Sequence, residues 1–77
     1  MKEVKDMGKP YATKDGFALY QDGAAFIVYS IFKDEGKDVA NFRGYLSNPE
    51  NFESVVEDLK YEDKLAMIEL QREFGYA

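Results

Sequence analysis

The chain contains no cysteine, no histidine and no tryptophan among its 77 residues. Without cysteine there are no disulfides, no thiolate zinc sites and no cysteine nucleophile. Without histidine the commonest general base and the commonest transition-metal ligand are also missing. Because small secreted domains usually depend on disulfides or bound metals, these absences favour a cytoplasmic protein.

The known motifs of catalysis and cofactor binding are absent as well. There is no Gly-x-Ser-x-Gly turn and no phosphate-binding Gly-x-x-x-x-Gly-Lys loop. Asp34, Gly36 and Asp38 supply only fragments of a calcium loop, and Lys33 and Lys37 flank them. No apolar run approaches the roughly 18 residues that cross a membrane. We therefore expect no enzymatic activity, no metal, no cofactor and no membrane segment.

What the chain does contain is enough apolar material for a core. Hydrophobic residues make up 45% of it, and twelve of them are Phe or Tyr. The length allows one domain. The net charge of -5 is uneven, because residues 1–46 carry seven basic and seven acidic side chains while residues 47–77 carry three and eight. The whole acidic excess therefore lies in the second part of the chain.

The first part of the chain predicts an antiparallel sheet. Residues 1–14 lack a clear period and are expected to form a loosely ordered N-terminal arm. Three runs rich in β-branched and aromatic residues then predict a three-stranded meander within residues 17–46. The runs cover residues 17–21, 24–32 and 39–46. Asp22-Gly23 is typical of a two-residue type I′ hairpin, and residues 33–38 form a polar loop.

The second part of the chain predicts helix over residues 48–75. Ser47 and Glu50 have the spacing of a capping box, and Pro49 suits a first turn. The apolar residues then recur at intervals of three and four. They are Phe52, Val55, Val56 and Leu59, followed by Ala66, Met67, Leu70 and Phe74. Asp63 interrupts this stripe, so we expect one kinked helix or two helices, with a break near residues 59–62 favoured. The predicted fold is α+β, with the helices packed on one sheet face.

Alternation of side chains sorts the strands into two faces. With Gln21 opposite Ala24 and Lys33 opposite Asp38, one face is almost wholly apolar and is expected to hold the helices. It carries Ala18, Tyr20, Ala25, Ile27, Tyr29, Ile31, Ala40, Phe42 and Leu46. The other is expected to stay open, with Phe17, Leu19, Phe26, Val28, Phe32, Val39 and Tyr45, and with Gln21, Ser30, Asn41 and Arg43 among them. This register places Tyr29 opposite Phe42, Val28 opposite Arg43 and Phe26 opposite Tyr45, and Gly44 marks a candidate bulge.

An open face this rich in aromatic side chains predicts a covering partner. Three alternatives could cover it. They are the N-terminal arm, with Tyr11 in a groove of this face, a second copy of the chain, or a different protein. Aromatic residues and arginine most often carry interface energy. The predicted partner-binding residues of this face are Phe17, Leu19, Phe26, Val28, Arg43 and Tyr45.

The acidic helical part is the second predicted binding surface. Most of its carboxylates have no basic neighbour at helical spacing, so they either give solubility or steer the protein to a basic groove. Glu50, Glu53, Glu57 and Glu62 represent this surface. Direct nucleic-acid binding is disfavoured, since phosphate contact requires a basic field and the isoelectric point is near 4.6.

These observations favour a small acidic protein-binding module that inhibits or modulates a larger protein. A target with a basic nucleic-acid groove is expected, because acidic surfaces complement such grooves. By analogy, stand-alone acidic domains of this size occur among phage and mobile-element products that block host nucleases, CRISPR effectors or polymerases. The alternative is a homodimeric structural or interaction subunit that uses the open sheet face as its dimer interface.

Overall fold

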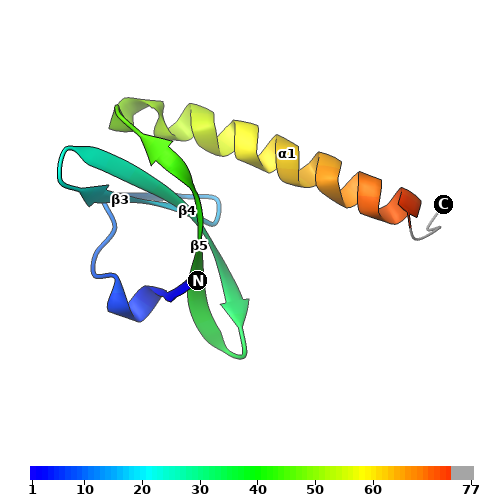
Figure 1. The fold of residues 1–77 in the computed structure, drawn as a ribbon, viewed down its shortest axis with the longest axis horizontal. Helices are drawn as coiled ribbons and strands as arrows, with labels where there is room; N and C mark the ends of the chain where they lie inside the picture. Colours follow the sequence, from blue (N-terminus) through cyan, green and yellow to red (C-terminus); the bar gives the residue numbers. More distant parts are fainter. Residues whose placement is uncertain (74–77) are drawn as a thin grey trace.

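The protein is an α+β fold in which one long helix crosses a twisted antiparallel sheet (Figure 1). The computed structural model describes residues 1–73. The strands are β1 (Lys2–Glu3), β2 (Ala12–Lys14), β3 (Phe17–Asp22), β4 (Ala25–Asp34) and β5 (Lys37–Leu46). The helices are two 3₁₀ turns, η1 (Val4–Asp6) and η2 (Pro49–Asn51), and α1 (Phe52–Glu73). The order across the sheet is β1-β5-β4-β3-β2.

The sheet has five strands rather than the three predicted. The two additional strands are short and come from the N-terminal segment, which lies at both edges of the meander. Strand β1 pairs antiparallel with β5, with Lys2 opposite Ala40, and β2 pairs antiparallel with β3, with Ala12 opposite Leu19. Strands of two and three residues are too short to show a period, which is why the sequence pattern did not reveal them.

The first hairpin turns one residue later than predicted. Gly23 and Ala24 form the loop, and Asp22 lies opposite Ala25. Gly23 has φ 62°, while Ala24 has no positive φ, which fits a type II′ turn with glycine at its first central position. The register consequently moves by two residues, and a shift of two leaves every side chain on its predicted side.

The second hairpin confirms most of its predicted register. Lys33 lies opposite Asp38 and Tyr29 opposite Phe42, as expected. The loop predicted between Lys33 and Asp38 is too long, because Glu35 and Gly36 alone make the turn, with φ 52° and 79°. Positive φ at both central positions is the type I′ geometry that continues the twist of the strands.

A β-bulge at Arg43 changes the end of β5. Tyr29 pairs with Phe42 but the preceding Val28 pairs with Gly44, so Arg43 is the extra residue. The predicted pairs of Val28 with Arg43 and Phe26 with Tyr45 are therefore wrong. Beyond the bulge the alternation of side chains reverses. A bulge near Gly44 was predicted, but this reversal was not.

The helical segment is capped by Asn48 rather than by Ser47 and does not break. It starts with the 3₁₀ turn η2, and α1 itself begins at Phe52 rather than at residue 48. The Asn48 side-chain Oδ1 accepts a hydrogen bond of 3.0 Å from the backbone N–H of Glu50, so Asn48 supplies the cap predicted for Ser47. Pro49 follows in the first turn, as expected. The favoured break near residues 59–62 is wrong, since α1 is continuous over 22 residues. Residues 74–75 of the predicted helical segment lie outside the described residues.

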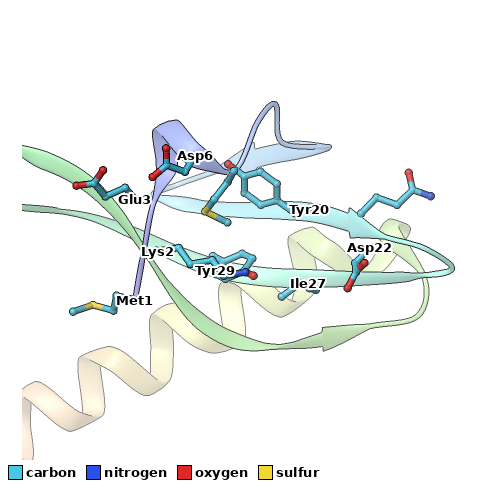
Figure 2. Close-up of a pocket in the computed structure, with 10 residues that line it drawn as sticks. Met1, Lys2, Glu3, Asp6, Tyr20, Asp22, Ile27 and Tyr29 are labelled. Atoms are coloured by element: carbon cyan, nitrogen blue, oxygen red, sulfur yellow. The ribbon is translucent and has the colours of Figure 1, made fainter.

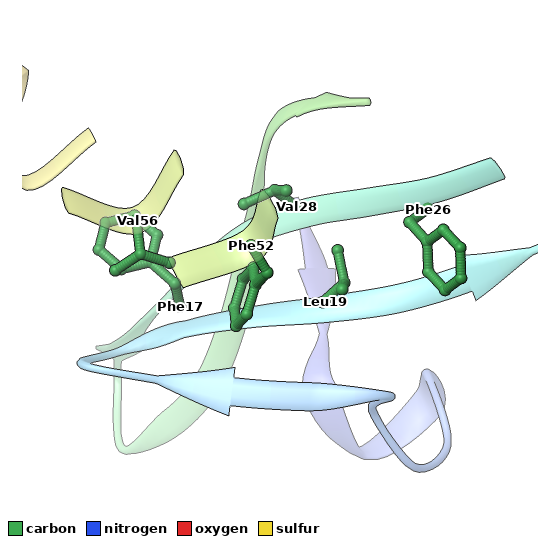
Figure 3. Close-up of a cluster of buried hydrophobic side chains, with 6 residues drawn as sticks. All are labelled: Phe17, Leu19, Phe26, Val28, Phe52 and Val56. Carbon is green, nitrogen blue, oxygen red and sulfur yellow. The ribbon is translucent and has the colours of Figure 1, made fainter. Parts of the chain in front are cut away.

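The helix covers the sheet face that was predicted to stay open (Figure 3). The core on this side is formed by six buried side chains from the sheet and α1. They are Phe17, Leu19, Phe26, Val28, Phe52 and Val56. The bulge explains the error, because it turns Leu46 onto this face, where Leu46 packs against the cluster. The chain therefore leaves β5 on the side opposite to the one predicted.

The N-terminal segment covers part of the other face. Val4 and Met7 pack there against a second cluster of Ala18, Tyr20, Tyr29 and Ala40. The arm thus does cover a sheet face, but it is the one that the sequence assigned to the helices. Tyr11 of the same segment reaches the helix side, where its ring lies 5.0 Å from that of Phe26.

Candidate binding surfaces

Four of the predicted partner-binding residues are inaccessible. Phe17, Leu19, Phe26 and Val28 are at most 8% exposed, and the helix lies over them. Their apolar character is explained by the core that they form with α1. The prediction that this face is open is wrong, and these side chains cannot serve as a docking surface in this fold.

Arg43 lies on the helix side and fastens α1 to the sheet. Its guanidinium donates two hydrogen bonds to the Asp63 carboxylate, at 2.9 and 3.1 Å. Its Cζ lies 5.9 Å from the centre of the Phe17 ring. The hydrogen bonds to Asp63 raise the pKa of Arg43, against the opposing effect of burial. Asp63, which was predicted to interrupt the apolar stripe, thus joins the helix to β5.

Tyr45 lies on the far side of the sheet from the helix. The bulge places Phe42 and Tyr45 on the same face, although residues three apart in a regular strand point to opposite faces. The two rings are 5.2 Å apart, and Phe42 is also 6.4 Å from Tyr29. Tyr29, Phe42 and Tyr45 thus form an aromatic row. Phe42 is 50% and Tyr45 73% exposed, so the two rings at the end of this row are open to solvent.

An open groove of about 660 Å³ runs beside this row, between the N-terminal segment and the sheet (Figure 2). Tyr20, Ile27 and Tyr29 line it from the sheet. The Tyr20 hydroxyl is buried and has no hydrogen-bond partner within residues 1–73, and burial raises the pKa of this residue. Glu3, on the segment, has a pKa lowered by its hydrogen bonds with Lys37 and then Lys5.

The four predicted acidic residues do not form one surface. A helix advances about 100° per residue, so Glu62 lies about 140° around the axis from Glu57. The Lys14 ammonium lies 4.0 Å from the Glu53 carboxylate and 3.8 Å from that of Glu57. Glu57 also pairs with Lys60, at 3.6 Å. Glu50 is exposed in η2.

The C-terminal part of α1 projects away from the sheet (Figure 1). We call residues 64–73 the free segment. None of them is buried, and in the described part of the chain none takes part in an ion pair or a side-chain hydrogen bond. Leu65, Met67, Ile68 and Leu70 are nevertheless apolar and between 38% and 57% exposed. The prediction that Met67 and Leu70 belong to the packed stripe is therefore wrong.

The apolar side chains of this part of α1 form two stripes on opposite sides of the helix. The inner stripe (Ala66, Met67 and Leu70) continues the side that faces the sheet. The outer stripe (Tyr61, Leu65 and Ile68) lies about 180° away from it. The outer stripe is the feature that sequence reasoning missed. The signal was present, since a helix that packs on one sheet face has no need of apolar residues at its back.

The described residues hold no group of three or more carboxylate, imidazole or thiol side chains that could bind a metal ion. Within residues 1–73, no helix is long and apolar enough to cross a membrane. Comparison with models of protein families, with curated protein sequences and with solved structures found no match to this chain. The function must therefore be argued from the surfaces themselves.

Proposed function

We propose that this protein is a small binding module that inserts the free segment of α1 into an apolar groove on a larger protein, and thereby inhibits or modulates that protein. The observation that carries the proposal is the projecting helix with exposed Leu65, Met67, Ile68 and Leu70. The proposal includes no enzymatic step.

The exposure of these side chains is costly unless a partner covers them. The free segment continues a helix whose first turns are packed on the sheet, so its helical start is already formed. Its own ten residues, however, gain no stability from packing. Docking an apolar helix into a groove is a common mode of recognition, in which side chains at intervals of three and four act as anchors. Leu65 and Ile68 have this spacing on one side, and Met67 and Leu70 have it on the other.

The two stripes favour a groove over a flat surface. A single helix or a flat surface packed against α1 covers one stripe and leaves the opposite one in water. A concave groove covers both, as for helices that are apolar on all sides. The homodimer predicted on the open sheet face is not retained as a second function, because α1 covers that face.

Capture from the cells that produce the protein tests the proposal. The baits are the wild-type chain and the Leu65→Glu/Leu70→Glu variant, which alters both stripes. Phe32→Glu is the matched control, since Phe32 is 41% exposed but lies on β4, outside the free segment. We expect the wild type and the control to retain the same partner and the double variant to lose it. Retention of that partner by all three baits would contradict the proposal.

A further inference from the structure

The charged residues between the two stripes carry information about the partner. Glu62, Glu69 and Glu73 lie on one side of α1, about 90° from each apolar stripe. We call them the acidic row. All three are exposed, and none forms an ion pair with another described residue. Around this side of α1, the surface that a groove would meet therefore runs from the inner stripe through the acidic row to the outer stripe.

The opposite side of the helix does not balance the acidic row. Lys60 and Lys64 lie there, but the Lys60 ammonium is 3.1 Å from the Asp15 carboxylate and 3.6 Å from that of Glu57. Only Lys64 lies on this side without an ion pair among the described residues. Arg72, the other cation of the free segment, lies beside the outer stripe and about 60° around the axis from Glu69. Lys64 and Arg72 carry one charge fewer than the three glutamates and lie on different sides of the helix, so a second copy of this chain offers poor electrostatic complementarity.

Self-association is opposed by geometry as well as by charge. In an antiparallel two-fold pair of α1 helices, like sides adjoin, so the acidic row of one copy meets the acidic row of the other. In a parallel pair the acidic side adjoins the basic side, but Lys64 is the single unpaired cation that it meets there. Like charges held together at an interface cost several kcal/mol. The occupant of this surface is therefore a different protein.

We propose that the partner is a basic protein whose groove presents a row of Lys or Arg side chains flanked on both sides by apolar walls. This inference rests on the proposed function and adds the chemistry of the partner. The cations face the acidic row, whose members are seven and four residues apart, or about 10 and 6 Å along the axis. The apolar walls receive the inner and outer stripes.

This arrangement has a kinetic consequence. Complementary charge raises the rate of encounter, and salt screens exposed charges beyond about 8–10 Å. The acidic row is exposed along a projecting helix (Figure 1), where a cationic groove can approach it from a distance. Association should therefore slow as salt is added, while the apolar contacts keep dissociation slow.

Two designed helical peptides test the charge requirement without knowledge of the natural partner. One has leucine on its apolar face with lysine beside it, and the other has glutamate in place of each lysine. Each single helix covers one stripe and the acidic row beside it, which is the part of the surface that the charge requirement concerns. Fluorescence anisotropy of the labelled peptides measures binding to the full chain. We expect the lysine peptide to bind the wild type at least about tenfold more tightly than the glutamate peptide.

The variants locate the effect on α1. Glu62→Lys/Glu69→Lys/Glu73→Lys should weaken binding of the lysine peptide at least about tenfold. Glu62→Gln/Glu69→Gln/Glu73→Gln should give a smaller loss in the same direction. The control, Asp22→Lys/Asp34→Lys/Glu35→Lys, makes the same change in net charge on the hairpin turns and should leave binding within about twofold of the wild type.

Every other result overturns the inference. Such results are equal binding of the two peptides, binding of neither, or an equal loss in the control. A wild-type dimer in light scattering that Leu65→Glu converts to a monomer would show that a second copy is the occupant. In the capture experiment, loss of the partner with Leu65→Glu/Leu70→Glu but not with reversal of the acidic row would leave the proposed function standing and refute the cationic partner.

Discussion

The two ends of α1 share one sequence pattern but have opposite environments. Phe52 and Leu70 are 18 residues apart, which is five helical turns, so both side chains point to the side that faces the sheet. Phe52 is 4% exposed and lies in the core, whereas Leu70 is 48% exposed. The difference is set by the extent of the sheet, because the helix continues beyond the strands that could cover it (Figure 1).

This contrast separates stability from binding along one helix. Contacts with the sheet end at the ion pairs of Lys60 with Asp15 and of Arg43 with Asp63. Before that boundary, apolar side chains stabilise the fold. After it, side chains of the same kind contribute nothing to the fold and remain available to a partner. Apolar periodicity therefore identifies a helix face but does not say which molecule covers it.

Alanine at the two matched positions should give the largest difference. Phe52→Ala removes a buried ring and should lower the free energy of unfolding by about 3–5 kcal/mol. Because a domain of this length is expected to have only about 4–12 kcal/mol of stability, that loss is severe. Leu70→Ala should change it by less than about 0.5 kcal/mol. Urea unfolding measures both, and a similar loss at the two positions would mean that Leu70 is packed within the chain.

Proline substitutions compare the contributions of the two parts of α1 to stability through the backbone alone. Asp58 and Glu69 are both exposed, so neither substitution removes a buried side chain. Asp58→Pro should lower the free energy of unfolding by about 3 kcal/mol or more, because it breaks the helix where α1 packs on the sheet. Glu69→Pro should reduce helical circular dichroism but change the unfolding midpoint little. A cooperative loss of the sheet signal in Glu69→Pro would show that the free segment supports the fold.

The sequence predicted the secondary structure of this protein better than its faces. Alternation in the strands gave the correct partners from Tyr29 to Lys33, and the 3.6-residue period gave the helix. The bulge at Arg43 then reversed the last residues of β5, and with them the side on which the helix starts. Both faces are apolar, so composition held no signal that could reveal the reversal.

The candidate site was harder to predict for a related reason. Aromatic side chains on the sheet resembled an exposed interface because the amount of sheet surface covered by the helix was unknown. Asp63 resembled an interruption because its partner, Arg43, is 20 residues away. Only the three-dimensional path of the helix shows that the sheet aromatics are covered and that Leu65 and Ile68 are not.

The pair of Arg43 and Asp63 marks the boundary and should have an intermediate effect. The Arg43 side chain is 19% exposed and binds Asp63 through two hydrogen bonds. A double-mutant cycle with Arg43→Met and Asp63→Asn should give a coupling of about 1 kcal/mol, near the upper end for partly exposed pairs. The equivalent cycle for the more open pair of Lys14 and Glu57 should give less than about 0.5 kcal/mol. Equal coupling in both cycles would remove the special role of Arg43.

Lys60, on the same boundary, should produce the smallest effect, visible only at high pH. Its hydrogen bond with Asp15 raises the pKa of the Lys60 ammonium in the folded protein. A raised folded pKa gives a stability that is complete below the unfolded pKa of about 10.4 and disappears as the pH rises through the folded pKa. The wild type should therefore lose more stability than Lys60→Met above about pH 10, as measured by urea unfolding at each pH. Parallel losses in the two proteins would instead assign the alkaline sensitivity to the tyrosines and leave α1 without an electrostatic anchor at Asp15.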